Sequence, residues 1–231
     1  MILAGLQKNS FIDFPGKISC VLFTTGCNFV CPYCHNADLA RGEYPARFTL
    51  AAVSQFLATR RGMLDGVVIT GGEPTLHEDL DALCRALREM GYAVKLDTNG
   101  SRPAVLQRLL DAHLVDFIAM DVKAPLDSYA PFSRDTRIAD RLLASIRLIM
   151  QRAPAYEFRT TCARPFVDPA AVETIARTIE GAASYVLQSF NRRAACLDPD
   201  FTRHHDAAIA DADMQALKAL AAPFVDRCTI R

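Results

Sequence analysis

The stretch TTGCNFVCPYCHN, residues 24–36, is the most informative part of the chain. It places Cys27, Cys31 and Cys34 in the spacing C-x3-C-x2-C. The apolar run ISCVLFT, residues 18–24, leads directly into it and has the composition of a strand covered on both faces. The sequence therefore predicts three thiols grouped at the end of a buried strand.

Two kinds of metal site fit three thiols so close together. A structural zinc site takes four ligands, and His35 could nominally supply the fourth, although a histidine directly after Cys34 is awkwardly placed to bind the same ion. A cubane iron–sulfur cluster normally takes four thiolates, so that three leave one iron open to a substrate. The residues favour the open cluster and leave zinc as an alternative.

The composition is that of an ordinary soluble protein. Hydrophobic residues make up 51% and charged residues 23%, and 26 Lys and Arg balance 26 Asp and Glu. This balance gives no net field that would attract nucleic acid or an anionic membrane. No signal peptide and no run of about 20 apolar residues is recognisable. We expect a cytoplasmic protein, in which clustered thiols indicate metal or catalysis rather than disulfides.

Short β-rich runs alternate with helix-like segments along the chain. The runs cover residues 18–24, 66–70, 92–98, 116–122, 156–162 and 184–190. The helix-like segments cover residues 50–60, 80–90, 103–112, 138–151, 169–179 and 211–221, and a last short run covers 224–230. This alternation predicts an α/β fold with a parallel sheet, in one domain over residues 1–231.

The unusual motifs share one position in this pattern. TTGCNF follows the first run, TGGEPT ends the second, DTNG ends the third and DVKAP closes the fourth. In α/β barrels and open parallel sheets, ligands bind at the carboxyl ends of the strands. We therefore expect the four segments to line one cavity.

These motifs, in this order, resemble the radical S-adenosylmethionine (SAM) superfamily. CNFVCPYC is similar to that family's C-x3-C-x-aromatic-C signature, and GGE at residues 71–73 stands where the family binds the SAM amino group. The resemblance implies a partial (βα)6 barrel of the TIM type over about residues 16–191, with 192–231 as an extension of unassigned role.

The same resemblance implies the cofactors. One [4Fe-4S] cluster would be bound by Cys27, Cys31 and Cys34, and its open iron would take the amino and carboxylate groups of SAM. The other cysteines are scattered, and we expect no second cluster from them; they are Cys20, Cys84, Cys162, Cys196 and Cys228.

Further segments narrow the resemblance to glycyl-radical-enzyme activating proteins. CPYCHN, IDFPGK, LDTNG and MDVKAP are typical of them, and most of residues 6–162 is most similar to the activating protein of anaerobic ribonucleoside-triphosphate reductase. The implied activity is reductive cleavage of SAM followed by removal of a glycine Cα hydrogen from that reductase. A flavodoxin- or ferredoxin-type protein is the implied electron donor. Asp13 in IDFPGK is a candidate contact for the glycine loop or a member of a turn.

The resemblance assigns roles to the residues around the cluster. Gly71 and Gly72 would allow the backbone to approach SAM, and Glu73 would face its ammonium group. Tyr33 would stack on the adenine or shield the cluster from water, and Asn36 would donate to a cluster sulfur.

The ends of the third and fourth runs carry further candidates. Asp97, Thr98 and Asn99 resemble the strand end that contacts the ribose of SAM. Asp97 and Asp121 also match a place where related activases hold a monovalent cation beside the SAM carboxylate.

Three residues complete the candidate set. Lys123 would contact the SAM carboxylate or the peptide substrate and is grouped with the cysteines as catalytic. Arg159 lies in the middle of a strand, where an inward charge needs a partner, and is similar to a SAM contact of the family. Gln188 stands where related activases have a histidine.

Several other functions remain open. The chain could activate pyruvate formate-lyase or another glycyl radical enzyme. It could act on a small molecule, as the deazaguanine-forming synthases do, although IDFPGK and DVKAP count against this. A non-enzymatic zinc or iron–sulfur module is the alternative from a different class.

Overall fold

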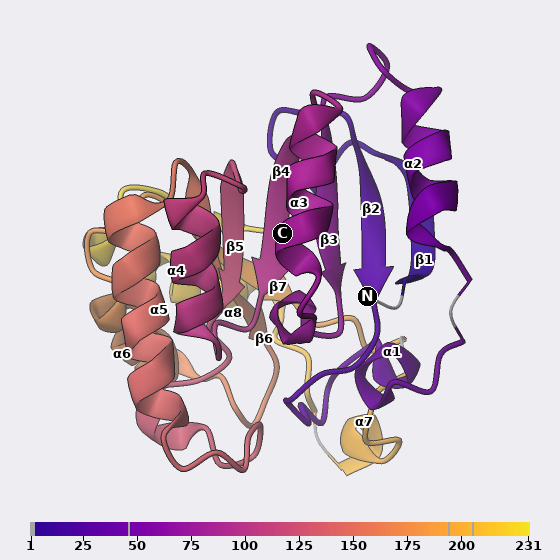
Figure 1. The fold of residues 1–231 in the computed structure, drawn as a ribbon. Coiled ribbons are helices and arrows are strands. Elements are labelled where there is room, and N and C mark those ends of the chain that lie inside the picture. The colour runs from indigo at the N-terminus through magenta and orange to yellow at the C-terminus, as the bar shows by residue number, and fades with distance from the viewer. Residues whose placement is uncertain (1–2, 46, 194, 205) are drawn as a thin grey trace.

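The computed structural model describes residues 3–45, 47–193, 195–204 and 206–231, which form one eight-stranded sheet in the order β1 to β8 (Figure 1). The strands are β1 Leu3–Ser10, β2 Ser19–Thr24, β3 Gly66–Gly71, β4 Ala93–Thr98, β5 Phe117–Asp121, β6 Tyr156–Cys162, β7 Tyr185–Ser189 and β8 Cys228–Ile230. Strands β2 to β8 are parallel, and β1 runs antiparallel to β2. The six predicted parallel strands are confirmed, with ends that differ by one residue at most.

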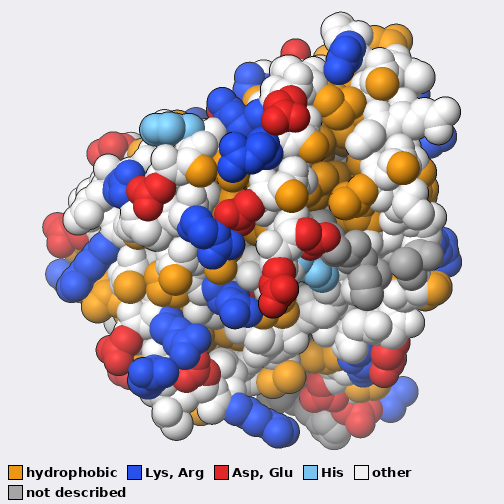
Figure 2. All heavy atoms as spheres, in the orientation of Figure 1, with side chains coloured by type: hydrophobic (Ala, Val, Ile, Leu, Met, Phe, Trp, Pro, Cys, Tyr) orange, Lys and Arg blue, Asp and Glu red, His pale blue; other side chains and the backbone are white. Residues whose placement is uncertain are grey.

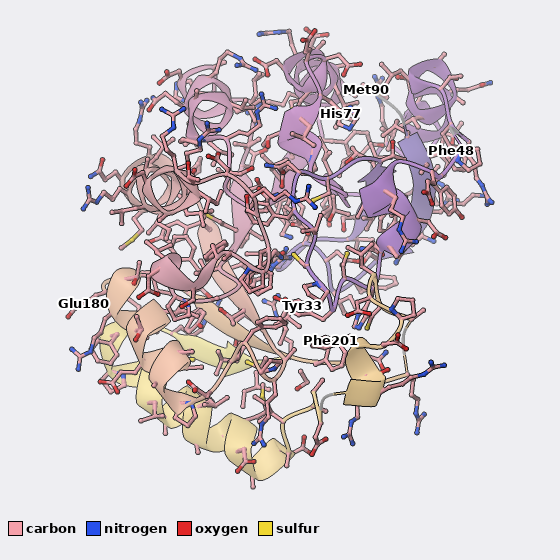
Figure 3. The ribbon with its side chains drawn as sticks, turned by 90° about the horizontal axis from the view of Figure 1, so that it is seen from below. Tyr33, Phe48, His77, Met90, Glu180 and Phe201 are labelled. Carbon is pink, nitrogen blue, oxygen red and sulfur yellow. The ribbon has the colours of Figure 1, made fainter. Side chains whose placement is uncertain are left out.

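The longer helices cover the outer face of the curved sheet, as the view from below shows (Figure 3). The α-helices are α1 Ala37–Arg41, α2 Leu50–Ala58, α3 Leu80–Glu89, α4 Pro103–Asp111, α5 Ile138–Arg152, α6 Pro169–Thr178, α7 Phe201–His204 and α8 Asp211–Ala221. Short 3-10 turns are η1 Pro74–Leu76, η2 Leu126–Ser128 and η3 Ala222–Phe224. All six predicted helices are present, and a partial barrel of alternating strands and helices is confirmed.

Helix starts follow from local chemistry. The Asp168 carboxylate accepts a hydrogen bond of 2.7 Å from Ala171 N, and Pro169 occupies the first turn of α6. Thr49 caps α2 in the same way, through a bond of 3.2 Å from Ala52 N. These side chains satisfy backbone N–H groups that have no partner inside the helix.

Alternating side chains of the strands enter two separate cores. Leu22, Ile69 and Leu96 are fully buried in the large core that the strands share with the outer helices. Val21 and Val68, on the opposite face, form a small inner cluster of their own. Because successive side chains of a strand point to opposite faces, this parity also identifies which residues of β4, β5 and β6 face the barrel interior.

Strand β1 was not predicted from the sequence. Its residues LAGLQKNS include glycine, lysine and asparagine, which are poor strand formers, and its exposed second half lacks an apolar pattern. It pairs with β2 along one edge, with Ser10 opposite Ser19.

The IDFPGK loop follows from the direction of β1. It joins the end of β1 to the start of β2 and so lies at the amino ends of the parallel strands, opposite to the cysteines. Phe14 packs there against Val21 and Val68, and the Asp13 carboxylate accepts a hydrogen bond from the Ser10 hydroxyl. Asp13 therefore lies in a turn remote from the cavity described below.

The residues after 191 extend the sheet and approach the cysteine loop. Strand β8 pairs with β7, with Tyr185 opposite Cys228, and α8 packs beside α6. Helix α7 lies with α1 below the carboxyl ends of the strands (Figure 1). In the part of the chain that the structure describes, no helix is long and apolar enough to cross a membrane.

Figure 2 shows the face formed by α3, α4 and α5, where basic and acidic side chains are interspersed. Arg88 pairs with Asp116 at 2.7 Å, and Arg108 pairs with Asp81 at 2.7 Å. Hydrophobic side chains gather nearer to α2. The mixed charges on this face agree with the equal numbers of basic and acidic residues in the sequence.

Candidate metal and cofactor site

A cavity of about 200 Å³ lies at the carboxyl ends of β3 to β6. Its lining comes from all four segments that the sequence singles out: Cys27, Phe29, Cys31, Cys34, Asn36, Ala40, Thr70, Gly71, Gly72, Asp97, Thr98, Asn99, Asp121, Lys123 and Arg159. The structure thus brings together every residue predicted to contact the cluster or SAM except Tyr33, Glu73 and Gln188.

Two glycines at the end of β3 allow the cysteine loop to pack against this strand. Gly72 N donates to Thr24 O at 2.9 Å, and Glu73 N donates to Gly26 O at 2.8 Å. A Cβ atom on Gly72 would lie 2.0 Å from Gly26 O, and one on Gly71 would lie 2.3 Å from Thr24 O. Because no side chain fits in these gaps, the glycine pair determines where the cysteine loop begins.

Glu73 lies outside the cavity, and its carboxylate is wholly buried. It accepts hydrogen bonds from Thr75 N at 3.0 Å, Thr98 Oγ1 at 2.8 Å and Asn99 N at 2.6 Å. Burial raises the pKa of Glu73, while these donors oppose the rise. The predicted role of Glu73, facing the ammonium group of SAM, stays a prediction. In the structure Glu73 joins the end of β3 to the end of β4.

Tyr33 also points away from the cavity. Its ring is 5% exposed and lies among Phe132, Phe166, Phe190 and Phe201, with centroid distances between 5.8 and 6.4 Å. Figure 3 shows Tyr33 on the side of Phe201, and the Tyr33 hydroxyl is buried without a hydrogen-bond partner among the described residues. Of the two predicted roles, this position favours shielding the cysteine loop over stacking on a ligand.

Gln188 lies on the inner face of β7, opposite Thr161 in the register. The side chain is half-buried and does not line the cavity. The role of Gln188 at the place of the family's histidine therefore stays a prediction.

Charged side chains form a continuous chain of ion pairs along the inner wall of the cavity. Arg159 lies at its centre, and its Nη1 is 3.1 Å from Asp97 Oδ2 while its Nε is 2.8 Å from Asp121 Oδ1. Lys123 Nζ is 3.3 Å from Asp121 Oδ2. At the other end Lys95 Nζ bonds Asp97 Oδ1. Strand register explains the central contact, because Asp121 lies directly opposite Arg159.

Ion pairing shifts the pKa values of Asp121, Lys123 and Arg159. Burial raises the pKa of Asp121, but the charges of Arg159 and Lys123 outweigh it and hold that pKa at about 2. Burial lowers the pKa of Lys123 and of Arg159, and neighbouring carboxylates, Asp121 first, raise both above their usual ranges. Asp121, Lys123 and Arg159 therefore stay charged at neutral pH and line the cavity.

The three thiols face this wall across the cavity. Burial raises the pKa of Cys27 to about 12 and that of Cys31 to about 11. Among the described residues, no three His, Cys, Asp or Glu side chains converge as the ligands of a single ion would. Thiolate donors are what an iron–sulfur cluster binds, and metal binding would displace their protons.

Nitrogen donors surround the Cys27 sulfur. Phe29 N donates to it at 3.4 Å, and Asn99 Nδ2 lies 3.9 Å away. Asn99 Nδ2 also bonds Asn28 Oδ1 at 3.0 Å, which orients the amide. Asn36 lines the same cavity, and its role as a donor to a cluster sulfur stays a prediction.

A second cavity of about 370 Å³ adjoins the first, and Asn36 lines both. Its wall combines the inner face of β1 and β2 with the segment after the cysteines: Ala4, Gly5, Phe23, His35, Asn36, Ala37, Asp38, Leu39, Tyr44 and Ala195. Most of these side chains are apolar or aromatic, so the second cavity offers contact area next to the charged one.

A strap formed by residues 196–198 was not foreseen from the sequence. Leu197 N donates to Cys34 O at 2.9 Å, and Asp198 N donates to Pro32 O at 3.0 Å. Arg41 Nη2 holds the strap from the other side through Leu197 O at 3.0 Å. The carboxyl-terminal extension thus buttresses the cysteine loop.

Lys95 is the other unpredicted member of the site. It lies two residues before Asp97, on the same face of β4, and only 1% of its side chain is exposed. A lysine two residues before an aspartate in an otherwise apolar strand indicates an ion pair on one face, and this pattern is visible in the sequence.

Comparison with known proteins identifies relatives along the whole chain. The sequence model of the radical SAM superfamily matches residues 21–179. A Methanocaldococcus jannaschii protein named "Putative glycyl-radical enzyme activating enzyme" is 32% identical over 235 aligned residues, which cover 100% of this chain and 95% of the relative. A 7-carboxy-7-deazaguanine synthase of Synechocystis is 36% identical over 78 residues, covering 34% of this chain and 36% of that one.

Solved structures share the fold. SuiB of Streptococcus suis bound to its precursor peptide SuiA aligns with a TM-score of 0.68 at 12% identity, covering 91% of this chain and 48% of that one. A structure of TYW1 with a lysine-pyruvate adduct bound gives a TM-score of 0.60 at 17% identity and covers 89% of this chain and 72% of that one. At these identities the likeness concerns the fold.

Proposed function

The chain belongs to the radical SAM superfamily, and from this membership we propose that it activates a glycyl radical enzyme, with anaerobic ribonucleoside-triphosphate reductase as its partner. The observation that carries the proposal is one cavity in which three thiols face a fixed set of cations and carboxylates. A relative named as an activating enzyme, alignable from end to end, supports the reaction class. The motifs IDFPGK and DVKAP support the choice of partner.

The thiols and the charged side chains bind different groups in this proposal. A reduced [4Fe-4S] cluster on Cys27, Cys31 and Cys34 would supply the electron that splits bound SAM into methionine and a 5′-deoxyadenosyl radical, which takes the Cα hydrogen of the target glycine. Lys123 and Arg159 present positive charge to the carboxylate of SAM.

The residues at the end of β4 suit a nucleoside. Asp97 lines the cavity as a charged acceptor, and Thr98 and Asn99 follow it in the same wall. Glu73 holds both of these residues through hydrogen bonds of 2.8 and 2.6 Å. The Asp97 carboxylate, which Lys95 and Arg159 hold in place, can accept the hydroxyl groups of a ribose, and its fixed position reduces the entropy lost on binding.

The substrate glycine belongs to a peptide in this proposal. The second cavity, with Phe23 and Tyr44 in its wall, lies beside the charged one and suits the side chains around such a glycine. The aromatic cluster around Tyr33 covers the cysteine loop from behind and limits the access of water. A flavodoxin- or ferredoxin-type protein is the proposed electron donor.

The proposal is tested by anaerobic incubation of the reconstituted protein with SAM, reductant and the reductase. We expect a glycyl doublet on the reductase in electron paramagnetic resonance, in step with 5′-deoxyadenosine formation. The matched control is Cys31→Ala, which should give neither signal. SAM cleavage without a doublet on the reductase would retain the chemistry and reject the partner.

A small-molecule radical SAM reaction is the second candidate. The observation that favours it is the match to a 7-carboxy-7-deazaguanine synthase, which covers about a third of each chain. Anaerobic incubation with SAM, reductant and a small-molecule metabolite fraction, without any partner protein, separates the two: formation of 7-carboxy-7-deazaguanine would support the second candidate over the first.

A further inference from the structure

Lys95 is an ammonium group buried inside the barrel. Its side chain is 1% exposed and bonds Asp97 Oδ1, whose own side chain is 13% exposed. The ring of Phe117 lies 5.7 Å from Lys95 Nζ, so the ammonium is bounded by a carboxylate on one side and by an aromatic face on another. Burying a charge in this way is costly unless it is paired, and Asp97 supplies the pairing.

All four carboxylate oxygens of the cavity wall accept a bond from a cationic nitrogen. Asp97 receives Lys95 on Oδ1 and Arg159 on Oδ2. Asp121 receives Arg159 on Oδ1 and Lys123 on Oδ2. A monovalent metal ion needs several oxygen ligands with spare negative charge, and these two carboxylates are already opposed by three positive groups.

We propose that Lys95 is a built-in counter-cation and a positioning residue for Asp97, which allows the cavity to bind SAM without a monovalent metal ion. The ammonium holds one oxygen of Asp97 from the barrel interior while Arg159 holds the other. Each oxygen keeps a second lone pair, which can accept a neutral hydroxyl but gains little from another cation.

This arrangement differs from the cation site that the sequence resemblance suggests for Asp97 and Asp121. Strand geometry explains why the Lys95 ammonium can lie beside Asp97, where the resemblance suggests a metal cation. Lys95 and Asp97 are two residues apart on β4 and therefore share the inward face. The inference rests on the radical SAM membership of the chain and not on the identity of its partner protein.

The test measures how SAM binding depends on the salt cation. The reconstituted protein is dialysed anaerobically against labelled SAM in potassium chloride or, at equal ionic strength, in choline chloride, whose cation is too bulky for the site. We expect the wild-type dissociation constant to agree within about twofold between the two salts. Lys95→Met should bind roughly tenfold more weakly in choline, because Asp97 loses a charged partner, and potassium should restore most of the loss.

A second measurement does not depend on the cluster. Thermal unfolding of the metal-free protein should show no stabilisation of the wild type by potassium relative to choline, whereas Lys95→Met should gain stability from potassium. Lys8→Met, which removes an exposed lysine of β1, should behave as the wild type in both measurements.

Two outcomes would overturn the proposal. A wild-type protein that loses SAM affinity more than about fivefold in choline needs an external cation, and this result requires no variant. Lys95→Met protein that binds SAM like the wild type in both salts would show that the ammonium does not position Asp97. Neither outcome depends on a glycyl doublet on the reductase. The salt dependence of SAM binding could therefore still be interpreted if the partner assignment failed.

Discussion

The two sides of the cavity are built in opposite ways. We call Cys27, Cys31 and Cys34 the thiol wall. We call Asp97, Asp121, Lys123 and Arg159, together with Lys95 buried behind Asp97, the ionic wall. In the ionic wall every charge meets an opposite charge within the protein. In the thiol wall the backbone places the sulfurs, and burial keeps Cys27 and Cys31 protonated.

Because of this difference, we expect substitutions in the thiol wall to affect mainly function and substitutions in the ionic wall to affect stability as well. Removing a sulfur should abolish metal binding while leaving the fold nearly intact, because few protein contacts depend on it. Removing a charge from the ionic wall should destabilise the fold and the site together, because it leaves a buried partner without a counter-charge. Four substitutions test this division, from the largest expected effect to the smallest.

Cys31→Ala should cause the largest functional loss. We expect reconstituted protein to lose the absorbance and iron content of a cluster, together with all SAM cleavage, since two remaining thiolates cannot hold it. The free energy of unfolding of the metal-free protein should fall by only about 1 kcal/mol, as for other small buried truncations. Iron analysis checks the loss of the cluster, and urea unfolding checks the free energy of unfolding. A variant that retains a full cluster would contradict the role of the thiol wall.

Arg159→Met should destabilise the metal-free protein most, by about 3 kcal/mol, because Asp97 and Asp121 both lose a charged partner. The effect should depend on pH with a definite sign. The folded-state pKa of Asp121 lies at about 2, below its ordinary value, so its contribution is present above about pH 4 and disappears as the pH falls toward 2.

The stability difference between wild type and Arg159→Met should therefore be largest near neutral pH and shrink by about 2 kcal/mol between about pH 5 and pH 2. Urea unfolding at a series of pH values measures this directly. Arg177→Met, at an exposed ion pair within α6, is the control and should change stability by less than about 1 kcal/mol at every pH. A pH-independent effect of Arg159→Met would mean that packing and not charge explains it.

Glu73→Gln should sharpen the comparison, since Glu73 belongs to neither wall. Its buried carboxylate accepts bonds from Thr98 and Asn99, and the amide can replace only part of them. We expect a loss of about 2 kcal/mol in unfolding free energy and a smaller loss of SAM affinity. Glu89→Gln, on the exposed side of α3, is the matched control. A large loss of SAM affinity at unchanged stability would instead support a direct contact with SAM.

Tyr33→Phe should have the smallest effect. The substitution removes a buried hydroxyl that has no partner among the described residues, so stability should remain the same or rise by up to about 1 kcal/mol. Thermal unfolding and iron content should both match the wild type. A marked loss of cluster would show that the hydroxyl has a partner in the loaded protein.

Much of the fold and of the site could be predicted because both are expressed in local sequence patterns. Continuous apolar runs identified the six parallel strands, and the motifs at their ends identified most of the cavity lining. Asp121 and Arg159 come from different strands, yet the register that pairs them follows from the parallel sheet. Because the carboxyl ends of parallel strands meet at one edge of the sheet, motifs that follow different strands in the sequence line the same cavity.

The rest depended on contacts between distant segments. The strap bond from Leu197 to Cys34 joins residues far apart in sequence and involves only backbone atoms, so no side-chain pattern reveals it. Glu73 and Tyr33 have the residue types of ligand contacts. Their burial outside the cavity depends on packing with distant segments, which the sequence does not reveal. Lys95 was different, because its position in step with Asp97 was visible in the sequence.

The strap also determines when the cysteine loop can be complete during synthesis. Cys27 to Cys34 leave the ribosome early, whereas Leu197 and Asp198 emerge only when most of the chain has been translated. Until then Pro32 O and Cys34 O lack their final donors, and the loop has no fixed lower boundary. The cysteine loop therefore gains these two backbone donors only after residues 196–198 have folded back against it.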